Sequence, residues 1–206
     1  MKKRNFGWKD VQPVTVNVVN HKEFLISINE LLSDSETVLD VGCGVGETLE
    51  KFSCPIKIGV DAHRPYLENA KSGEHFLKIN FRAECLKELF LPNSIDTVTL
   101  IDVIEHFEKE VAWDVLQQVE EIAAKRVIIF TPRGFFRQLD VDHYNLGGES
   151  LQRHRSGWEV EDFEKLGYSI TIFSQFHDQS NKAFLEVYGE NAKPVDALLA
   201  WKEMSK

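Results

Sequence analysis

The chain has 206 residues, of which 43% are hydrophobic, and this length suits one domain with a single buried core. Its 33 acidic and 24 basic side chains give a formal net charge of -9, which counts against a protein that binds nucleic acid through phosphates. No stretch approaches the roughly 20 apolar residues of a membrane span, and no signal-peptide pattern follows the basic start, so we expect a cytoplasmic protein. Three cysteines without CxxC spacing predict reduced thiols rather than disulfides or a zinc cluster.

Helical and strand-like segments alternate through the first two thirds of the chain. Residues 21–33 place apolar side chains at helical spacing, and residues 108–124 do so over a longer run. Between them lie short segments rich in β-branched residues and bounded by Gly, Pro, Asn or Asp, as buried strands are: 37–42, 56–61, 75–80, 95–101 and 126–131. This alternation predicts an α/β fold with a doubly wound, mostly parallel sheet and helices on both faces.

The regular alternation of helical and strand-like segments ends after Pro132. Residues 133–157 mix aromatic, charged and glycine residues without a period, which predicts an insertion over the carboxyl edge of the sheet. The remainder is predicted as a helix, two strands and a final helix that begins at a proline: 158–168, 168–176, 182–190 and 194–204. No repeat or linker divides the chain, so we expect one domain over residues 1–206.

The stretch "VLDVGCGVGETL" joins the first predicted strand to a helix, where doubly wound sheets usually contact their ligand. Gly42 and Gly44 would let backbone amides approach that ligand, and the positive end of the following helix would face it. Gly46 comes one position too early for the dinucleotide fingerprint GxGxxG, which counts against NAD. Asp40 ends the strand, where a carboxylate would repel a phosphate and suit a cationic amine.

A second carboxylate, Asp61, ends the next predicted strand about twenty residues after the glycines. There it can accept hydrogen bonds from both hydroxyls of an unphosphorylated ribose. A nucleoside with a cationic amino-acid tail describes S-adenosylmethionine.

Three segments, "VLDVGCGVGETL", "GVDAHRPYLENAK" and "SIDTVTLIDVIEHF", resemble in order and spacing the class I S-adenosylmethionine-dependent methyltransferases, especially their small-molecule branch. The resemblance covers about residues 30–175. It implies a Rossmann-like, seven-stranded, mostly parallel sheet whose seventh strand is antiparallel, with 168–176 and 182–190 as the final hairpin.

The resemblance also implies roles for individual residues. Asp40, Gly42 and Gly44 would hold the methionine moiety, and Asp61 would hold the ribose. Ala62 and His63 would contact the adenosine. Asn80 would accept the adenine amine. Glu84 is the alternative to Asn80, because this sequence has "KINFRAE" where the family commonly has "GDA". Ile101 and Asp102 would contact the amine of the cofactor through their backbone.

The segment "DVIEHF" supplies the candidate for acid–base chemistry. A sulfonium is already an activated methyl donor, so alignment supplies much of the rate and a base is needed only for a hydroxyl or protonated amine. His106 has an ordinary pKa near the working range and is the catalytic candidate, as base or substrate orienter. Alternatively, Glu105 and His106 fix the loop by hydrogen bonds.

The expected function is methyl transfer to the O, N or C atom of a small molecule, without a metal. One alternative resembles small-RNA 3′-terminal 2′-O-methyltransferases, in which Asp102, Glu105 and His106 with His143 or His154 would bind a divalent metal. Another is a module that binds the cofactor without turnover. The aromatic and charged side chains of the insertion predict an acceptor lid: Phe135, Phe136, His143, Tyr144, His154, Arg155 and Trp158. The pattern leaves the acceptor and the oligomeric state open.

Overall fold

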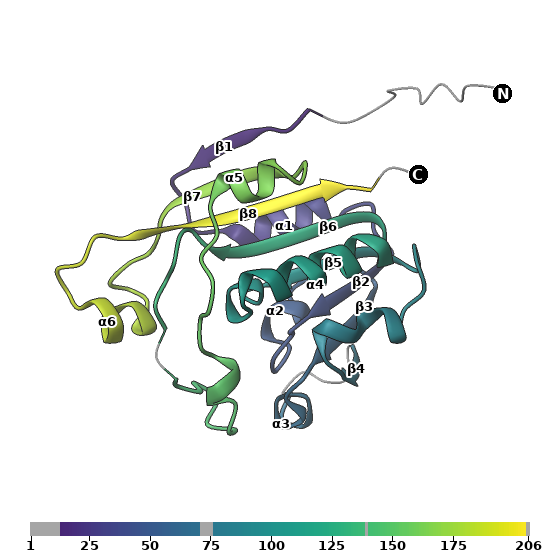
Figure 1. Ribbon diagram of the computed structural model, residues 1–206, viewed down its shortest axis with the longest axis horizontal. Helices are drawn as coiled ribbons and strands as arrows, with labels where there is room; N and C mark the ends of the chain where they lie inside the picture. The colour runs from purple at the N-terminus through teal and green to yellow at the C-terminus, as the bar shows by residue number, and fades with distance from the viewer. Residues whose placement is uncertain (1–12, 71–75, 139, 205–206) are drawn as a thin grey trace.

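A computed structural model describes residues 13–70, 76–138 and 140–204, which form an eight-stranded sheet with helices on both faces (Figure 1). The strand order is β1-β7-β8-β6-β5-β2-β3-β4, and only the two pairs that include β8 are antiparallel. The strands are Val16–Val19 (β1), Thr37–Val41 (β2), Ile56–Asp61 (β3), Leu77–Asn80 (β4), Ile95–Ile101 (β5), Ala123–Pro132 (β6), Ser169–His177 (β7) and Val195–Glu203 (β8). The predicted doubly wound α/β class with an antiparallel last strand is confirmed.

Six α-helices lie among the described residues: Phe24–Leu31 (α1), Glu47–Glu50 (α2), Arg64–Glu68 (α3), Lys109–Ile122 (α4), Val160–Glu164 (α5) and Lys182–Tyr188 (α6). Three short 3₁₀ helices span Ala83–Glu88 (η1), Ile104–His106 (η2) and Glu149–Leu151 (η3). The helices predicted over 21–33 and 108–124 are confirmed as α1 and α4, and the one over 158–168 as the shorter α5. None of the helices in the described ranges is long and apolar enough to cross a membrane.

Two apolar cores lie on opposite faces of the sheet. Strand β6 contributes side chains to both cores, because successive residues of a strand point to opposite faces of the sheet. Val127 and Ile129 join the core beneath α4 and α5, whereas Ile128 and Phe130 join the core that contains side chains of α1 and α2. A strand that is buried on both faces has a continuous run of apolar residues, and this run allows β6 to be predicted from the sequence.

The last third of the chain differs from the prediction. Residues 182–190 were expected as a strand but form α6, which begins after Asn181, whose side-chain oxygen accepts the Phe184 N–H at 3.2 Å. Residues 194–204 were expected as a helix but form β8, which lies between β6 and β7 and pairs with both. Its apolar residues, Ala197–Ala200, are therefore buried on both faces, and so short a run has no period that separates helix from strand.

The sheet also has one strand more than the seven expected. Strand β1 precedes the first predicted strand and pairs in parallel with β7 at the edge of the sheet. Its side chains are mostly exposed, so it lacks the buried apolar pattern of the other strands. The basic start of the chain, and residue 75 of the strand expected over 75–80, lie outside the described residues.

Candidate active site

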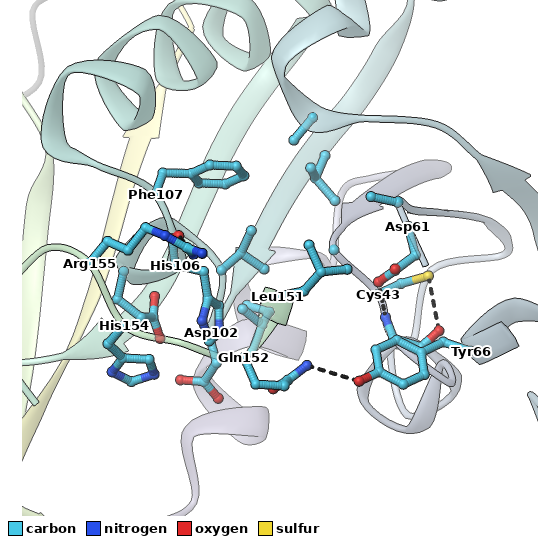
Figure 2. Close-up of a pocket in the computed structure, with 18 of the residues that line it drawn as sticks. Cys43, Asp61, Tyr66, Asp102, His106, Phe107, Leu151, Gln152, His154 and Arg155 are labelled. Atoms are coloured by element: carbon cyan, nitrogen blue, oxygen red, sulfur yellow. Dashed lines mark hydrogen bonds between the residues drawn. The ribbon is translucent and has the colours of Figure 1, made fainter. Parts of the chain in front are cut away.

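A cavity of about 850 Å³ opens at the carboxyl edge of the parallel strands. Figure 2 shows Cys43, Asp61 and Tyr66 along one side of it, with Asp102, His106 and His154 across from them. The first group comes from the loop after β2, the end of β3 and α3, and the second comes from the segment after β5 and from the insertion after β6. Parallel strands bring these residues to one edge although they lie far apart in sequence.

The loop after β2 has left-handed backbone at each of its glycines, a conformation that favours glycine. At Gly44 (φ 56°) a Cβ atom would meet nothing within 4 Å, and this residue lines the cavity. At Gly42 (φ 73°) a Cβ atom would lie 2.6 Å from Val103 Cγ2, so a side chain there would push the loop away from the end of β5. All three glycines therefore suit a left-handed backbone, and Gly42 also lacks the room for a side chain.

The first three amides of this loop already donate hydrogen bonds within the protein. Gly42 N–H and Cys43 N–H both donate to Val60 O, at 2.7 and 3.1 Å, and Gly44 N–H donates to Asp61 Oδ2 at 2.8 Å. The following helix α2 is a single turn that starts at Glu47, so its dipole adds little. This arrangement suits a cationic group better than an anionic one.

Two buried carboxyls line this part of the cavity. Asp40 is 2% exposed and accepts the Thr99 hydroxyl at 2.6 Å, and burial raises its pKa to about 7. Asp61 is 7% exposed and accepts the N–H of Gly44 and that of His63, the latter at 2.7 Å. Burial raises the pKa of Asp61, and the two amides oppose that rise. Each carboxylate oxygen of Asp61 retains a second lone pair with which it can bind a hydroxyl.

The residues expected at the adenosine take different places. Ala62 lines the cavity, but His63 Nε2 lies 2.8 Å from Leu146 O and joins the end of β3 to the insertion. Asn80 donates its amide group to the carbonyls of Asp61 and Ala62, at 2.9 and 3.0 Å, and is outside the cavity wall. Both side chains therefore make hydrogen bonds that stabilise the segment at the end of β3.

The wall beyond Ala62 comes instead from Phe81 to Glu84. Burial raises the pKa of Glu84, but the 2.6 Å hydrogen bond from Arg82, a backbone hydrogen bond and the charge of Arg82 together outweigh this and leave the pKa below its ordinary value. Glu84, the alternative to Asn80, is thus an ionised acceptor on the cavity wall.

The end of β5 forms the floor. Ile101 and Asp102 line the cavity, and Asp102 has a left-handed backbone (φ 53°) with its N–H donated to Phe130 O at 2.8 Å. Burial raises the pKa of Glu105, three residues later, and the nearby Asp102 carboxylate raises it further. Glu105 is 2% exposed and accepts the Thr131 hydroxyl at 3.0 Å through Oε2. Its Oε1 has no hydrogen-bond partner among the described residues.

Glu105 and two histidines form a compact cluster. One ligand atom each from Glu105, His106 and His154 lies within 4.8 Å of the others, so the group could hold a metal ion. The ring nitrogens Nδ1 of His106 and His154 face the carbonyls of Arg153 (3.3 Å) and Phe136 (2.6 Å). Burial lowers the pKa of His106, and burial together with His106 lowers that of His154 to about 3.

The insertion over 133–157 lines the opposite wall. Of its residues named above, Phe136, Tyr144, His154 and Arg155 reach the cavity. Phe135 and His143 are exposed instead, and Trp158 is fully buried. The two ends of the insertion meet, because Gly134 N–H donates to Trp158 O at 2.7 Å.

A buried polar network ties the insertion to α3, and both lie together at the lower edge of the sheet in Figure 1. The Tyr66 hydroxyl donates to Asp142 Oδ1 at 2.9 Å and accepts Gln152 Nε2 at 3.2 Å. Asp142 also accepts the N–H groups of Tyr144, Leu146 and Gly148. One buried carboxylate therefore shapes the loop over the cavity.

Sequence reasoning missed several cavity residues: Tyr66, Val103, Gln138, Gln152, His177 and Asn181. His177 directly follows the strand predicted over 168–176, and ligands gather at the carboxyl ends of parallel strands, but the sequence does not show which way this strand runs in the sheet.

Residues 38–126 match the family model of a methyltransferase domain. Among curated proteins, none matches the chain significantly. Solved structures share the fold. YcgJ from Bacillus subtilis has a TM-score of 0.63 and 15% identity, over 90% of this chain and 100% of its own. The methyltransferase domain of a bacterial CtHen1 has a TM-score of 0.54 and 20% identity, over 87% of this chain and 97% of its own.

Magnesium protoporphyrin IX methyltransferase (ChlM) from Synechocystis PCC 6803, solved with bound S-adenosylhomocysteine (SAH), has a TM-score of 0.55 and 17% identity. The match covers 90% of this chain and 84% of that protein. The family match spans the glycine loop, Asp61 and the "DVIEHF" segment, and the fold extends the similarity to most of the chain. The chain therefore matches a methyltransferase domain over residues 38–126 and shares the fold of solved methyltransferases over most of its length.

Proposed function

We propose that the protein transfers a methyl group to the O, N or C atom of a small molecule, by in-line displacement from S-adenosylmethionine. The observation that carries this proposal is the continuous cavity, which runs from the glycine loop to the histidines under the insertion. Its 850 Å³ falls within the ordinary range for small-molecule sites, roughly 300 to 1,000 Å³. The insertion acts as the acceptor lid within a single domain, and the cytoplasmic location stays a prediction.

The cofactor is proposed to lie over β2, β3 and β5. Asp40 and the Gly42–Gly44 loop hold the methionine end, and Asp61 binds the ribose hydroxyls. Ala62 packs on the adenosine, with Glu84 rather than Asn80 as the acceptor for the adenine amine. Ile101 and Asp102 complete the site near the methionine end.

The acid–base step is assigned to His106. Its lowered pKa keeps the imidazole neutral near pH 7, as a general base requires. When Nδ1–H donates to Arg153 O, the Nε2 lone pair is left to take a proton from the acceptor. A hydroxyl or ammonium acceptor therefore becomes a nucleophile as the methyl group leaves sulfur.

The test is a mass-spectrometric screen for methylated products, with the protein, labelled S-adenosylmethionine and a metabolite extract. We expect a labelled small molecule, and we expect His106→Ala to lower its rate without abolishing cofactor binding. Arg64→Ala, an exposed residue of α3, is the matched control and should leave the rate unchanged. If the wild type binds cofactor and labels nothing in the extract, the small-molecule proposal is wrong.

A second candidate is metal-assisted 2′-O-methylation at the 3′ end of an RNA. It is favoured by the Glu105, His106 and His154 cluster, in which the buried Oε1 of Glu105 has no partner among the described residues. One carboxylate and two imidazoles fit a hard or borderline divalent ion, which would polarise the acceptor hydroxyl when bound. The cluster uses His154, whereas the exposed His143 takes no part in it. The net charge of -9 counts against RNA.

Manganese binding separates the two candidates. Calorimetry with MnCl₂ on the chelator-treated protein should show a site that His154→Ala removes and His143→Ala leaves intact. An oligoribonucleotide with a free 3′ end is the substrate for the RNA function. If a chelator abolishes methylation of this RNA and manganese restores it, the RNA function becomes the leading candidate. No manganese binding, or equal binding by both variants, would refute the metal site.

A further inference from the structure

His177 is a buried histidine that the steps above do not use. It ends β7, lines the cavity and is only 7% exposed. Neither Nδ1 nor Nε2 has a hydrogen-bond partner in the part of the chain that the structure describes. A neutral imidazole carries one donor and one acceptor, so both capacities are left unmet at a place where water is largely excluded.

The ring is uncharged near pH 7. Burial, together with the positive charge of Lys22, lowers its pKa to about 4, and the charge of Asp178 opposes this. Its aromatic neighbours are Phe136, at a centroid distance of 4.9 Å and 40° between the planes, and Phe176 at 5.1 Å. Two uncharged polar side chains, Gln138 and Asn181, also line the cavity and lie close in sequence to Phe136 and His177. The cavity lining at this end is therefore aromatic and uncharged, and the nearby Lys22 and Asp178 pair with each other at 2.6 Å.

His177 lies away from the proposed cofactor. The strand order places β7 three positions from β5, which Asp102 directly follows, and four from β2. At a strand spacing of about 4.8 Å, β7 is roughly 14 Å from β5 across the sheet. A group that reaches His177 is therefore remote from the atom that receives the methyl group.

From this placement we infer that His177 is a specificity-determining residue for the acceptor. It binds an uncharged, planar ring that carries a hydrogen-bonding atom, such as a phenol or a neutral nitrogen heterocycle, at the end of the acceptor remote from its methylated atom. Phe136 packs against the face or edge of that ring, and a His177 nitrogen makes the hydrogen bond. The inference rests on the proposed small-molecule function and narrows its substrate class. Such remote contacts supply binding energy that positions the reacting atom.

Phenol serves as the probe, and toluene, which has the same ring without the hydroxyl, is the matched control. Both are titrated into the SAH-bound protein with ¹³C-labelled histidine, and the His177 ring signals are followed by NMR. We expect phenol to shift these signals, and its affinity to fall about two- to twelvefold in His177→Phe, as for one lost hydrogen bond. Toluene should bind both proteins equally.

Unfolding measurements separate this role from a structural one. His177→Phe removes two unpaired polar atoms from an aromatic cluster, so it should be at least as stable to urea as the wild type. A lower stability would identify a structural histidine and overturn the inference. So would equal phenol affinity in both proteins, or no shift of the His177 signals. If the wild type does not bind SAH, the proposed function itself fails, whereas SAH binding without phenol binding overturns only this inference.

Discussion

Replacing Asp61 by Ala should weaken SAH binding by about 12- to 150-fold. The carboxylate holds Gly44 N–H and His63 N–H through one oxygen each, which leaves one lone pair on each oxygen for a ribose hydroxyl. Each hydrogen bond to a charged group contributes about 1.5 to 3 kcal/mol, so the predicted change in Kd is that of one lost bond, the least that the substitution should remove. Isothermal titration calorimetry with SAH measures it directly.

The substitution also removes two backbone contacts, so it needs a control that loses the same kind of contact elsewhere. Asp96 accepts the N–H groups of Glu36 and Thr37, at 2.8 and 3.4 Å, at the opposite end of the sheet. Asp96→Ala should lower the free energy of unfolding comparably and leave SAH affinity unchanged. If Asp61→Ala bound SAH like the wild type, the assignment of Asp61 to the ribose would be wrong.

Three further predictions concern the loop, the lid and pH. Gly46→Ala should lower the free energy of unfolding more than Gly44→Ala, because its Cβ would lie 2.4 Å from Phe76 Cζ; Gly44→Ala should instead weaken SAH binding more, as calorimetry would show. Tyr66→Phe should cost about 0.5 to 1.5 kcal/mol in urea unfolding and speed amide exchange over residues 142–148, and unchanged exchange would argue against the lid network. Because folding lowers the pKa of His154 to about 3, the unfolded chain binds the proton first as pH falls below 6.5. The wild type should then lose stability relative to His154→Asn by up to about 1.4 kcal/mol per pH unit, and parallel pH profiles of urea unfolding would contradict this.

The sequence was most informative where one local pattern decides the structure. The strands β2, β3, β5 and β6 follow from short runs rich in β-branched residues, and the helix α4 follows from apolar residues at helical spacing, because these elements are largely buried. The prediction was wrong for α6 and β8, because a short apolar run fits either element until its neighbours are known. The place of β8 between β6 and β7 decided this, and that pairing joins residues far apart in the chain.

Some residues of the candidate site could likewise be predicted from the sequence, and others could not. Asp40, Gly44 and Asp61 stand at strand ends, and the structure places all three on the cavity wall. Asn80 ends a strand too, but its amide turns back onto the carbonyls of the neighbouring strand end. The direction of that side chain depends on contacts across the sheet. His177 needed the direction of β7 in the sheet, which no local pattern contains.

The hydrogen bond from Gly134 N–H to Trp158 O closes the insertion at its base, so its two ends leave the sheet side by side. The entropic cost of closing a loop grows only with the logarithm of its length, so a stem of this kind tolerates longer or shorter segments at little cost to folding. Evolution or an engineer could therefore exchange everything between the two stem residues in one step. With the insertion as the proposed acceptor lid, such an exchange would change the range of acceptors and leave the proposed cofactor site intact.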